Sequence, residues 1–192
     1  MAKNRTPETC GQEIRAPATG GFFSRTLVPF LRLTKLDCMK GIRVSAKAVI
    51  IRDGKLLVTV NDDIQGEFRL LPGGGQDPGE PLTEALRREC REEMDVEIDV
   101  GDIVFTRDYI GSRHEFANRQ SDVHQLEIMF SCGLPAGEEP AMTDSADDFQ
   151  TGVEWCPLEN LERLRFYPAA LIPHLRDFAA DRNHPNYIGA VN

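Results

Sequence analysis

Residues 70–98 read LLPGGGQDPGEPLTEALRRECREEMDVEI, and the rest of the chain is interpreted from this stretch. Three consecutive glycines permit backbone angles that other residues rarely adopt. Pro81 suits the first turn of a helix, because a backbone N–H would have no partner within the helix there. The stretch therefore predicts a loop followed by a helix that begins near Glu80 or Pro81 and ends near Met94 or Asp95.

Acidic residues crowd onto one side of the predicted helix. Glu89 stands one turn from both Glu92 and Glu93, so the three carboxylates share a face. Like charges at this spacing repel one another, and a hard divalent cation such as Mg²⁺ relieves the repulsion through oxygen ligands. The alternative is a solvated acidic face with pairs inside the helix, such as Arg88 with Glu92. Beside the acids runs an apolar stripe: Leu82, Ala85, Leu86 and Cys90.

The spacing of the glycine and the charged residues carries more information than their number. Gly, five residues, Glu, seven residues, Arg-Glu, two residues and Glu-Glu follow one another on Gly74, Glu80, Arg88, Glu89, Glu92 and Glu93. This order resembles the Nudix box, G-x5-E-x7-R-E-U-x-E-E-x-G-U, in which U is apolar. This sequence departs from the box at one position, because the last glycine of the box is Asp95 here. That glycine ends the helix in the left-handed conformation, which Asp tolerates at a cost of about 1 kcal/mol.

The resemblance implies a fold and an activity. The implied fold is an α/β domain, an α/β/α sandwich with a mixed β-sheet, covering about residues 42–180. The implied enzyme is a pyrophosphohydrolase that uses Mg²⁺ or Mn²⁺ to cleave a diphosphate linkage in a nucleoside diphosphate derivative. Both a substrate of the nucleotide-sugar or ADP-ribose type and a nucleoside triphosphate fit this description.

The resemblance also assigns roles to residues of the box. Glu89, Glu92 and Glu93 look like the metal-binding acids. Glu80 and Arg88 look like the pair that steadies the loop and orients Glu89, and these three form the predicted catalytic group. Gly74 looks like the loop glycine beside the substrate.

The group that accepts the proton of the attacking water stays open at this point. Glu89 is the first choice, and the alternatives are Glu115 and the acidic loop 138–148. Glu127 lies in a predicted strand, opposite the apolar face, and is a candidate for a further metal ligand. The alternative for Glu127 is an ordinary exposed strand residue.

A basic and aromatic segment, residues 107–119, is the predicted binding site for the substrate. Its arginines, Arg107, Arg113 and Arg119, can hold phosphate oxygens in a planar fork, and its aromatic side chains can stack on a base. The alternative is a solvated connection with its aromatic side chains packed inward.

Alternating and β-branched residues predict the other elements. Strands are expected at 42–51, 56–60, 68–71 and 122–132, with a hairpin turn at 52–55, and residues 98–110 are expected to be mostly extended with a break at Gly101-Asp102. The segment 153–158 and a second helix at about 168–180 complete the pattern. Strands mixed with two helices are typical of a layered α/β domain.

Composition limits the remaining possibilities. The 192 residues, 41% of them hydrophobic, suit one globular domain, which we expect at 39–182 between an N-terminal extension (1–38) and a C-terminal tail (183–192). A net charge of −9 argues against binding of nucleic acid polymers, so the expected partner is a small nucleotide-like molecule.

No apolar run is long enough to cross a membrane. Five widely spaced cysteines without a C-x-x-C pair indicate reduced thiols and a cytoplasmic protein. A homodimer is left open.

A second hypothesis comes from a different class of function. The chain could be a non-catalytic Nudix module that binds a nucleotide ligand and acts as a sensor or regulator. The acids distinguish the two hypotheses, since a retired site usually loses Glu89, Glu92 or Glu93. Because all three are present, we expect an enzyme.

Overall fold

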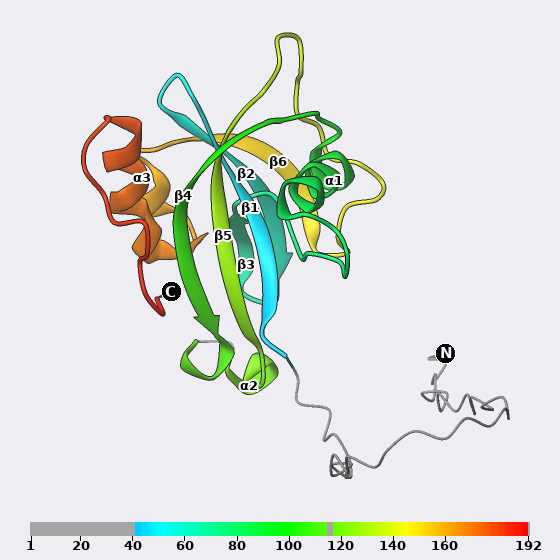
Figure 1. Ribbon diagram of the computed structural model, residues 1–192, viewed down its shortest axis with the longest axis vertical. Helices are drawn as coiled ribbons and strands as arrows, with labels where there is room; N and C mark the ends of the chain where they lie inside the picture. The colour runs from blue at the N-terminus through cyan, green and yellow to red at the C-terminus, as the bar shows by residue number, and fades with distance from the viewer. Residues whose placement is uncertain (1–40, 115–116, 192) are drawn as a thin grey trace, which may run out of the picture. The chain divides into compact units, whose positions relative to one another are not determined.

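The computed structural model describes residues 41–114 and 117–191 (Figure 1). The expected extension 1–38 and the candidate base Glu115 lie outside the described residues. In chain order the strands and α-helices are β1 (Arg43–Arg52), β2 (Lys55–Asp63), β3 (Gly66–Leu70), α1 (Leu82–Met94), β4 (Asp99–Ile110), α2 (Ala117–Gln120), β5 (His124–Gly133), β6 (Gln150–Pro157), β7 (Phe166–Tyr167) and α3 (Ile172–Ala179). Short 3₁₀ turns η1 (Gly111–Arg113), η2 (Leu161–Arg163) and η3 (Ala169–Leu171) connect some of them.

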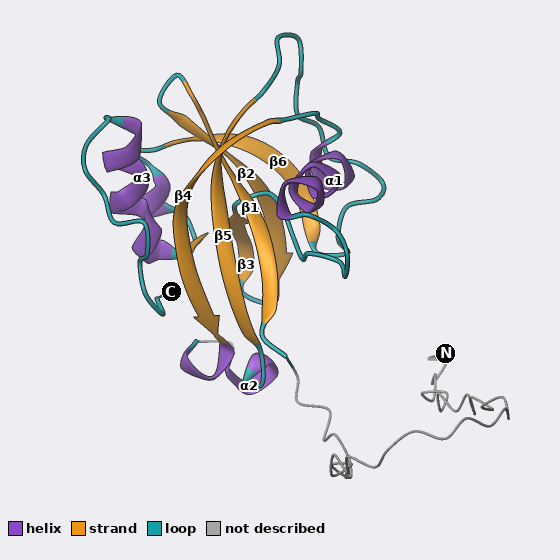
Figure 2. Ribbon diagram, in the orientation of Figure 1, coloured by secondary structure: helices purple, strands orange, loops and turns teal. Residues whose placement is uncertain are grey.

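The strands form a mixed sheet in the order β4-β5-β1-β2-β3-β7, with β6 also paired to β2 (Figure 2). The β1–β5 and β3–β7 pairs are parallel, and the others are antiparallel. The turn between β1 and β2 has positive φ at Asp53 (51°) and Gly54 (72°), as a tight two-residue hairpin turn requires. The predicted mixed sheet and its first hairpin are confirmed.

β1 and β2 separate soon after their hairpin, and this separation makes room for the glycine loop. The two strands pair only next to the turn, at Arg52 with Lys55 and at Ile51 with Leu56. Further along β1, the backbone N–H of Ala46 donates to Gly74 O (3.0 Å). Neighbouring hydrogen bonds join Ala48 N to Pro72 O (2.9 Å) and Gln76 N to Val44 O (3.0 Å). The loop therefore lies along the edge of β1 and is held in place by backbone hydrogen bonds.

The two longest helices cover opposite faces of the strands (Figure 1). The apolar stripe of α1 packs into one buried cluster, which includes Leu86, Cys90, Ile50 and Phe130. Leu175 of α3 belongs to a second cluster, with Phe105, Met129, Leu158 and other residues. The chain thus has a core on each side of the sheet, and the predicted α/β/α sandwich is confirmed.

α1 ends as the sequence predicts. Asp95 follows its last residue with φ 54° and ψ 37°, the left-handed conformation in which the box has a glycine. The loop that follows β5 then returns to this helix end. Thr143 Oγ1 donates to the carbonyl of Glu92, and Gln150 Nε2 donates to the carbonyl of Glu93 (2.8 Å). These side chains satisfy carbonyls that lack partners within the helix.

Other elements differ from the sequence prediction in detail. The helix expected over 168–180 begins as the 3₁₀ turn η3, which follows Pro168, and becomes α-helical at Ile172, with Pro173 in the first turn of α3, where it has no helical hydrogen bond to lose. β6 begins at Gln150, earlier than expected, because pairing with β2 extends past the alternating residues. β4 runs through Gly101-Asp102 with shifts of register near Ile103 rather than breaking there.

The segment expected as a C-terminal tail lies against the outer edge of β4. The N–H of Thr106 donates to Asn186 O (2.6 Å), and the N–H of Ile188 donates to Thr106 O (3.0 Å). We call residues 186–191 the tail segment. It pairs with an edge that would otherwise expose unpaired backbone groups.

No helix in the described part of the chain has the length and apolar character needed to cross a membrane. The cytoplasmic location and the homodimer stay predictions.

Candidate active site

Arg88 ties the parts of the box together. Its Nε donates to Glu80 Oε1 and its Nη2 donates to Glu80 Oε2, both at 3.0 Å. Nη2 also donates to the carbonyl of Gly75 (3.0 Å), so the same guanidinium holds the glycine loop. Nη1 donates to Glu89 Oε1 (2.8 Å) and Glu92 Oε2 (3.2 Å). These acceptors raise the pKa of Arg88 above its ordinary value, and Arg88 in turn lowers the pKa of Glu80.

The glycine loop and the acidic helix approach each other too closely for side chains on the loop. A Cβ at Gly74 would overlap the carboxylate of Glu89. A Cβ at Gly73, which also has a φ of 113°, would overlap the carbonyl of Ala46 on β1. The glycines at these positions therefore let the carboxylate of Glu89 lie directly against the loop backbone.

Glu93 has the most perturbed carboxylate of the helix. Its Oε2 accepts a hydrogen bond from the N–H of Gly73 (2.7 Å). Burial raises the pKa of Glu93 to about 7, although Lys47 and this hydrogen bond act in the opposite direction. Asp147, in the acidic loop, adds to the increase. A carboxyl group with a pKa near neutral pH, next to a lysine, is typical of functional sites.

The carboxylates of Glu89, Glu92 and Glu93 have the chemistry to bind a divalent cation, but in this structure they do not lie close enough together to share one. Each of Glu89, Glu92 and Glu93 has one oxygen in a hydrogen bond, and its second oxygen has no such partner among the described residues. Oxygen ligands of this kind are what Mg²⁺ and Mn²⁺ prefer. Across 41–114 and 117–191, no three acids, histidines or cysteines lie close enough together to share one ion. Shared coordination therefore requires these side chains to turn toward one another.

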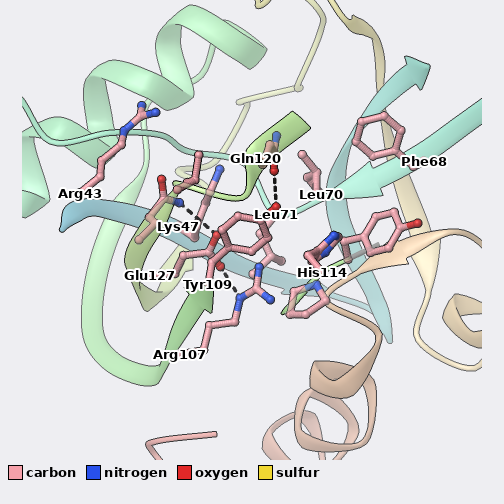
Figure 3. A pocket seen from close by; sticks show the side chains of 14 residues that line it. Arg43, Lys47, Phe68, Leu70, Leu71, Arg107, Tyr109, His114, Gln120 and Glu127 are labelled. Atoms are coloured by element: carbon pink, nitrogen blue, oxygen red, sulfur yellow. Dashed lines mark hydrogen bonds and ion pairs between the residues drawn. The ribbon is translucent and has the colours of Figure 1, made fainter. Parts of the chain in front are cut away.

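A cavity of about 380 Å³ lies next to the box (Figure 3). Lys47 lines it and also donates to the carbonyl of Gly73, so the cavity and the glycine loop share this side chain. One wall is aromatic, with ring centroids 4.9 Å apart for Tyr109 and His114 and 5.8 Å apart for His114 and Tyr167. Phe68 extends this wall, 6.0 Å from Tyr167. Aromatic walls of this kind provide stacking surfaces for a nucleobase.

Two residues predicted for different roles form one ion pair at this cavity (Figure 3). Arg107 Nε donates to Glu127 Oε2 at 2.5 Å, and the two residues face each other across β4 and β5. Both are buried, with exposed fractions of 4% and 8%. The alternative of an exposed Glu127 is therefore wrong, because cross-strand pairing with Arg107 compensates its burial. Its role as a metal ligand stays a prediction, and the carboxylate already has Arg107 and Gln125 as partners.

The other predicted arginines are not brought together in the same way. Arg113 is exposed and lines a smaller neighbouring cavity of about 100 Å³, beside Ala190 and Val191 of the tail segment. Arg119 belongs to α2, and the structure does not describe its side chain.

Cations on β1 were not predicted from the sequence. Arg43 and Lys47 both line the cavity, and a Cβ at Gly75 would overlap the guanidinium of Arg43. They lie four residues apart on one strand, so both side chains project from the same face. The sequence did contain a signal for this polar face: polar residues at 43, 45 and 47 alternate with apolar residues. Tyr167 had no such signal, since only the chain fold brings it to this cavity.

Comparison with known proteins agrees with this geometry. Residues 41–177 match the family model described as NUDIX domain. A nucleoside triphosphatase, NudI, of Salmonella agona is 33% identical over 106 residues, which is 53% of this chain and 74% of that protein.

Solved structures show the same fold. The E. coli ORF135 protein superposes with a TM-score of 0.52 at 25% identity, over 72% of this chain and 89% of that one. A NUDIX hydrolase from Nitrosomonas europaea gives a TM-score of 0.60 at 17% identity, over 76% and 93%. An ADP-ribose pyrophosphatase from Streptococcus suis gives 0.53 at 17% identity, over 78% and 99%. With the box geometry and the family match over most of its length, the chain belongs to the Nudix hydrolase family.

Proposed function

We propose that this protein hydrolyses a diphosphate linkage in a nucleoside diphosphate derivative and depends on Mg²⁺ or Mn²⁺. The observation that carries the proposal is the Arg88 network, which fixes the glycine loop and Glu89 against each other beside a cavity with an aromatic wall. A solvated acidic helix would need neither the buried loop contact nor the pairing with Glu80.

In this proposal each group of residues has a defined task. Glu89, Glu92 and Glu93 hold the cation, and Glu80 and Arg88 keep Glu89 in position. When bound, the divalent ion neutralises charge on the phosphates and helps to orient the attacking water. Glu89 is the first candidate to accept the proton of that water, and Asp147, which affects the pKa of Glu93, is the second.

The cavity supplies the binding site for the nucleoside end of the substrate. Its aromatic side chains face a base, while Arg43 and Lys47 lie between this wall and the acidic helix, on the path that the phosphates would follow. Gly74 lets the loop backbone and the carboxylate of Glu89 lie together beside the phosphates, and Arg107 contacts the substrate from the buried side of the cavity. Arg113, beside the smaller cavity, is assigned to the far end of the substrate.

A substrate panel tests the activity directly. Nucleoside triphosphates come first because the NudI relative is a nucleoside triphosphatase, and ADP-ribose and nucleotide sugars come next. Each is incubated with Mg²⁺ or Mn²⁺, and the products are separated to show which bond was cleaved. We expect a nucleoside monophosphate as one product, with no turnover in EDTA.

Variants of the helix connect the activity to the site. Glu89→Gln and Glu93→Gln should each abolish turnover, whereas Glu84→Gln, an exposed position on the same helix, should not. If both site variants are as active as the parent, the assignment of the site is wrong. If the parent binds nucleotides and cleaves none, the chain is the non-catalytic module.

A further inference from the structure

The tail segment is joined to the face of β4 as well as to its edge. The N–H of Asp108 donates to the carbonyl of Gly189 (3.1 Å), and Tyr187 Oη donates to Asp108 Oδ2 (2.7 Å). His124 of β5 lies at 3.1 Å from the other oxygen of Asp108. Hydrogen bonds from Tyr187 and His124 keep the pKa of Asp108 below its usual range. This carboxylate thus connects the tail segment to two neighbouring strands.

One contact of the tail segment reaches the substrate cavity. The carbonyl of Val191 accepts a hydrogen bond from Arg107 Nη1 (2.7 Å). The same guanidinium donates through Nε to Glu127, whose other oxygen accepts from Gln125 Nε2 (3.1 Å). Arg107, Glu127 and Gln125 all line the cavity. Arg107 therefore joins the tail segment to the cavity by hydrogen bonds.

We propose that the tail segment is a positioning element for the substrate site, and that the main-chain carbonyl of Val191 fixes the direction in which Arg107 faces the cavity. The inference rests on the proposed function of this site and adds the part played by a segment distant from the box. Val191 itself touches no substrate in this proposal and acts through Arg107.

The physical reason is the geometry of a buried guanidinium. Arg107 is almost fully buried, so each N–H without an acceptor carries a desolvation cost. Glu127 engages only Nε, and a guanidinium held at one corner can still rotate about that bond. Val191 accepts from Nη1 at a second corner and removes this rotation, which keeps the guanidinium in a fixed orientation over the ring of Tyr109, whose centroid lies 5.6 Å from Cζ. A preorganised donor binds substrate more tightly than one that must first be ordered.

A shortened chain tests the proposal. A chain ending at Gly189 lacks Val191 and keeps both acceptors on β4, the carbonyl of Asn186 and an oxygen of Gly189, which then belongs to the terminal carboxylate. We expect KM for the nucleotide to rise by roughly tenfold, the factor typical of one hydrogen bond to a charged group, with kcat within about twofold of the parent. Val191→Ala in the full-length chain keeps the main-chain carbonyl that accepts from Arg107, so it is the matched control and should behave as the parent does. Thermal melting shows whether each protein is folded.

A double-variant cycle tests whether the effect passes through Arg107. Arg107→Lys keeps the charge and loses the fork, so it should raise KM by itself. Shortening the chain in this background should add less than twofold, because the group that Val191 positions is already gone. Shortening it in the Glu84→Gln background should give the full tenfold effect. An equal effect in both backgrounds, or a fall in kcat at constant KM, would overturn the proposal.

The outcomes separate this inference from the proposed function. If the parent cleaves no nucleotide, the proposed function fails, and affinity for a nucleoside monophosphate, measured by calorimetry, replaces KM in the same cycle. If the parent cleaves nucleotides and the chain ending at Gly189 has the parent's KM, only the role of the tail segment fails.

Discussion

Replacing Glu93 by Gln removes a buried negative charge that destabilises the fold but that the proposed metal site requires. The folded-state pKa of Glu93 is raised to about 7 from an ordinary 4.5 by burial, so the folded protein holds this proton more tightly than the unfolded chain does. The stability from this group is therefore fully present below pH 4.5 and is lost as the pH rises through 7. Above pH 7 the ionised carboxylate destabilises the fold, and a neutral amide does not.

The magnitude follows from the pKa values. A difference of about 2.5 pKa units corresponds to about 3.4 kcal/mol at most. Because the side chain of Glu93 is only partly buried, solvent screening reduces this value. We expect Glu93→Gln to gain about 1–2 kcal/mol in the free energy of unfolding. The amide oxygen that Glu93→Gln introduces can still accept the hydrogen bond from Gly73. For a chain of this size, that gain raises Tm by roughly 2–8 °C.

The assay is thermal melting of parent and variant without divalent ions, at pH 8 and at pH 5. Glu93→Gln should melt higher at pH 8, and most of the difference should disappear at pH 5. Glu84→Gln serves as the control, since its carboxylate is exposed on the same helix. Adding Mg²⁺ should then raise the Tm of the parent and not that of Glu93→Gln. A variant that melts at or below the parent at pH 8 would show that Glu93 carries no desolvated charge, and would refute the reasoning.

Further predictions concern the loop, the network and the helix end. Gly74→Ala should lower kcat at least tenfold, because the added Cβ displaces the carboxylate of Glu89, and steady-state kinetics with a melting control measures this. Arg88→Lys loses the paired hydrogen bonds to Glu80 and should destabilise the fold by about 2 kcal/mol in urea unfolding, with a loss of turnover. Asp95→Gly should stabilise the fold by roughly 1 kcal/mol in the same unfolding assay, with kcat unchanged, because it relieves a left-handed conformation at the helix end.

The parts predicted from the sequence are those in which neighbours along the chain are also neighbours in space. The helix, its left-handed end at Asp95 and the closeness of Glu80, Arg88 and Glu89 all follow from spacing within one loop and one helix. Arg107 and Glu127 were singled out separately, but their pairing depends on the register of β4 against β5. Sequence periodicity determines the face of a strand on which a residue lies and does not determine the residue opposite it.

The same distinction explains why the cations of β1, Arg43 and Lys47, were missed, whereas Arg88 within the box was predicted. The acids come from one helix, where repulsion between them makes them conspicuous in the sequence. The cations of the site come from three elements: Arg88 from the same helix as the acids, Lys47 from β1 through its contact with the glycine loop, and Arg107 from β4. Each of these cations is held by a carbonyl or carboxylate from another part of the chain. An anionic substrate can therefore be bound by a chain with a net charge of −9, because local placement of charge, rather than the total, sets the potential in the cavity.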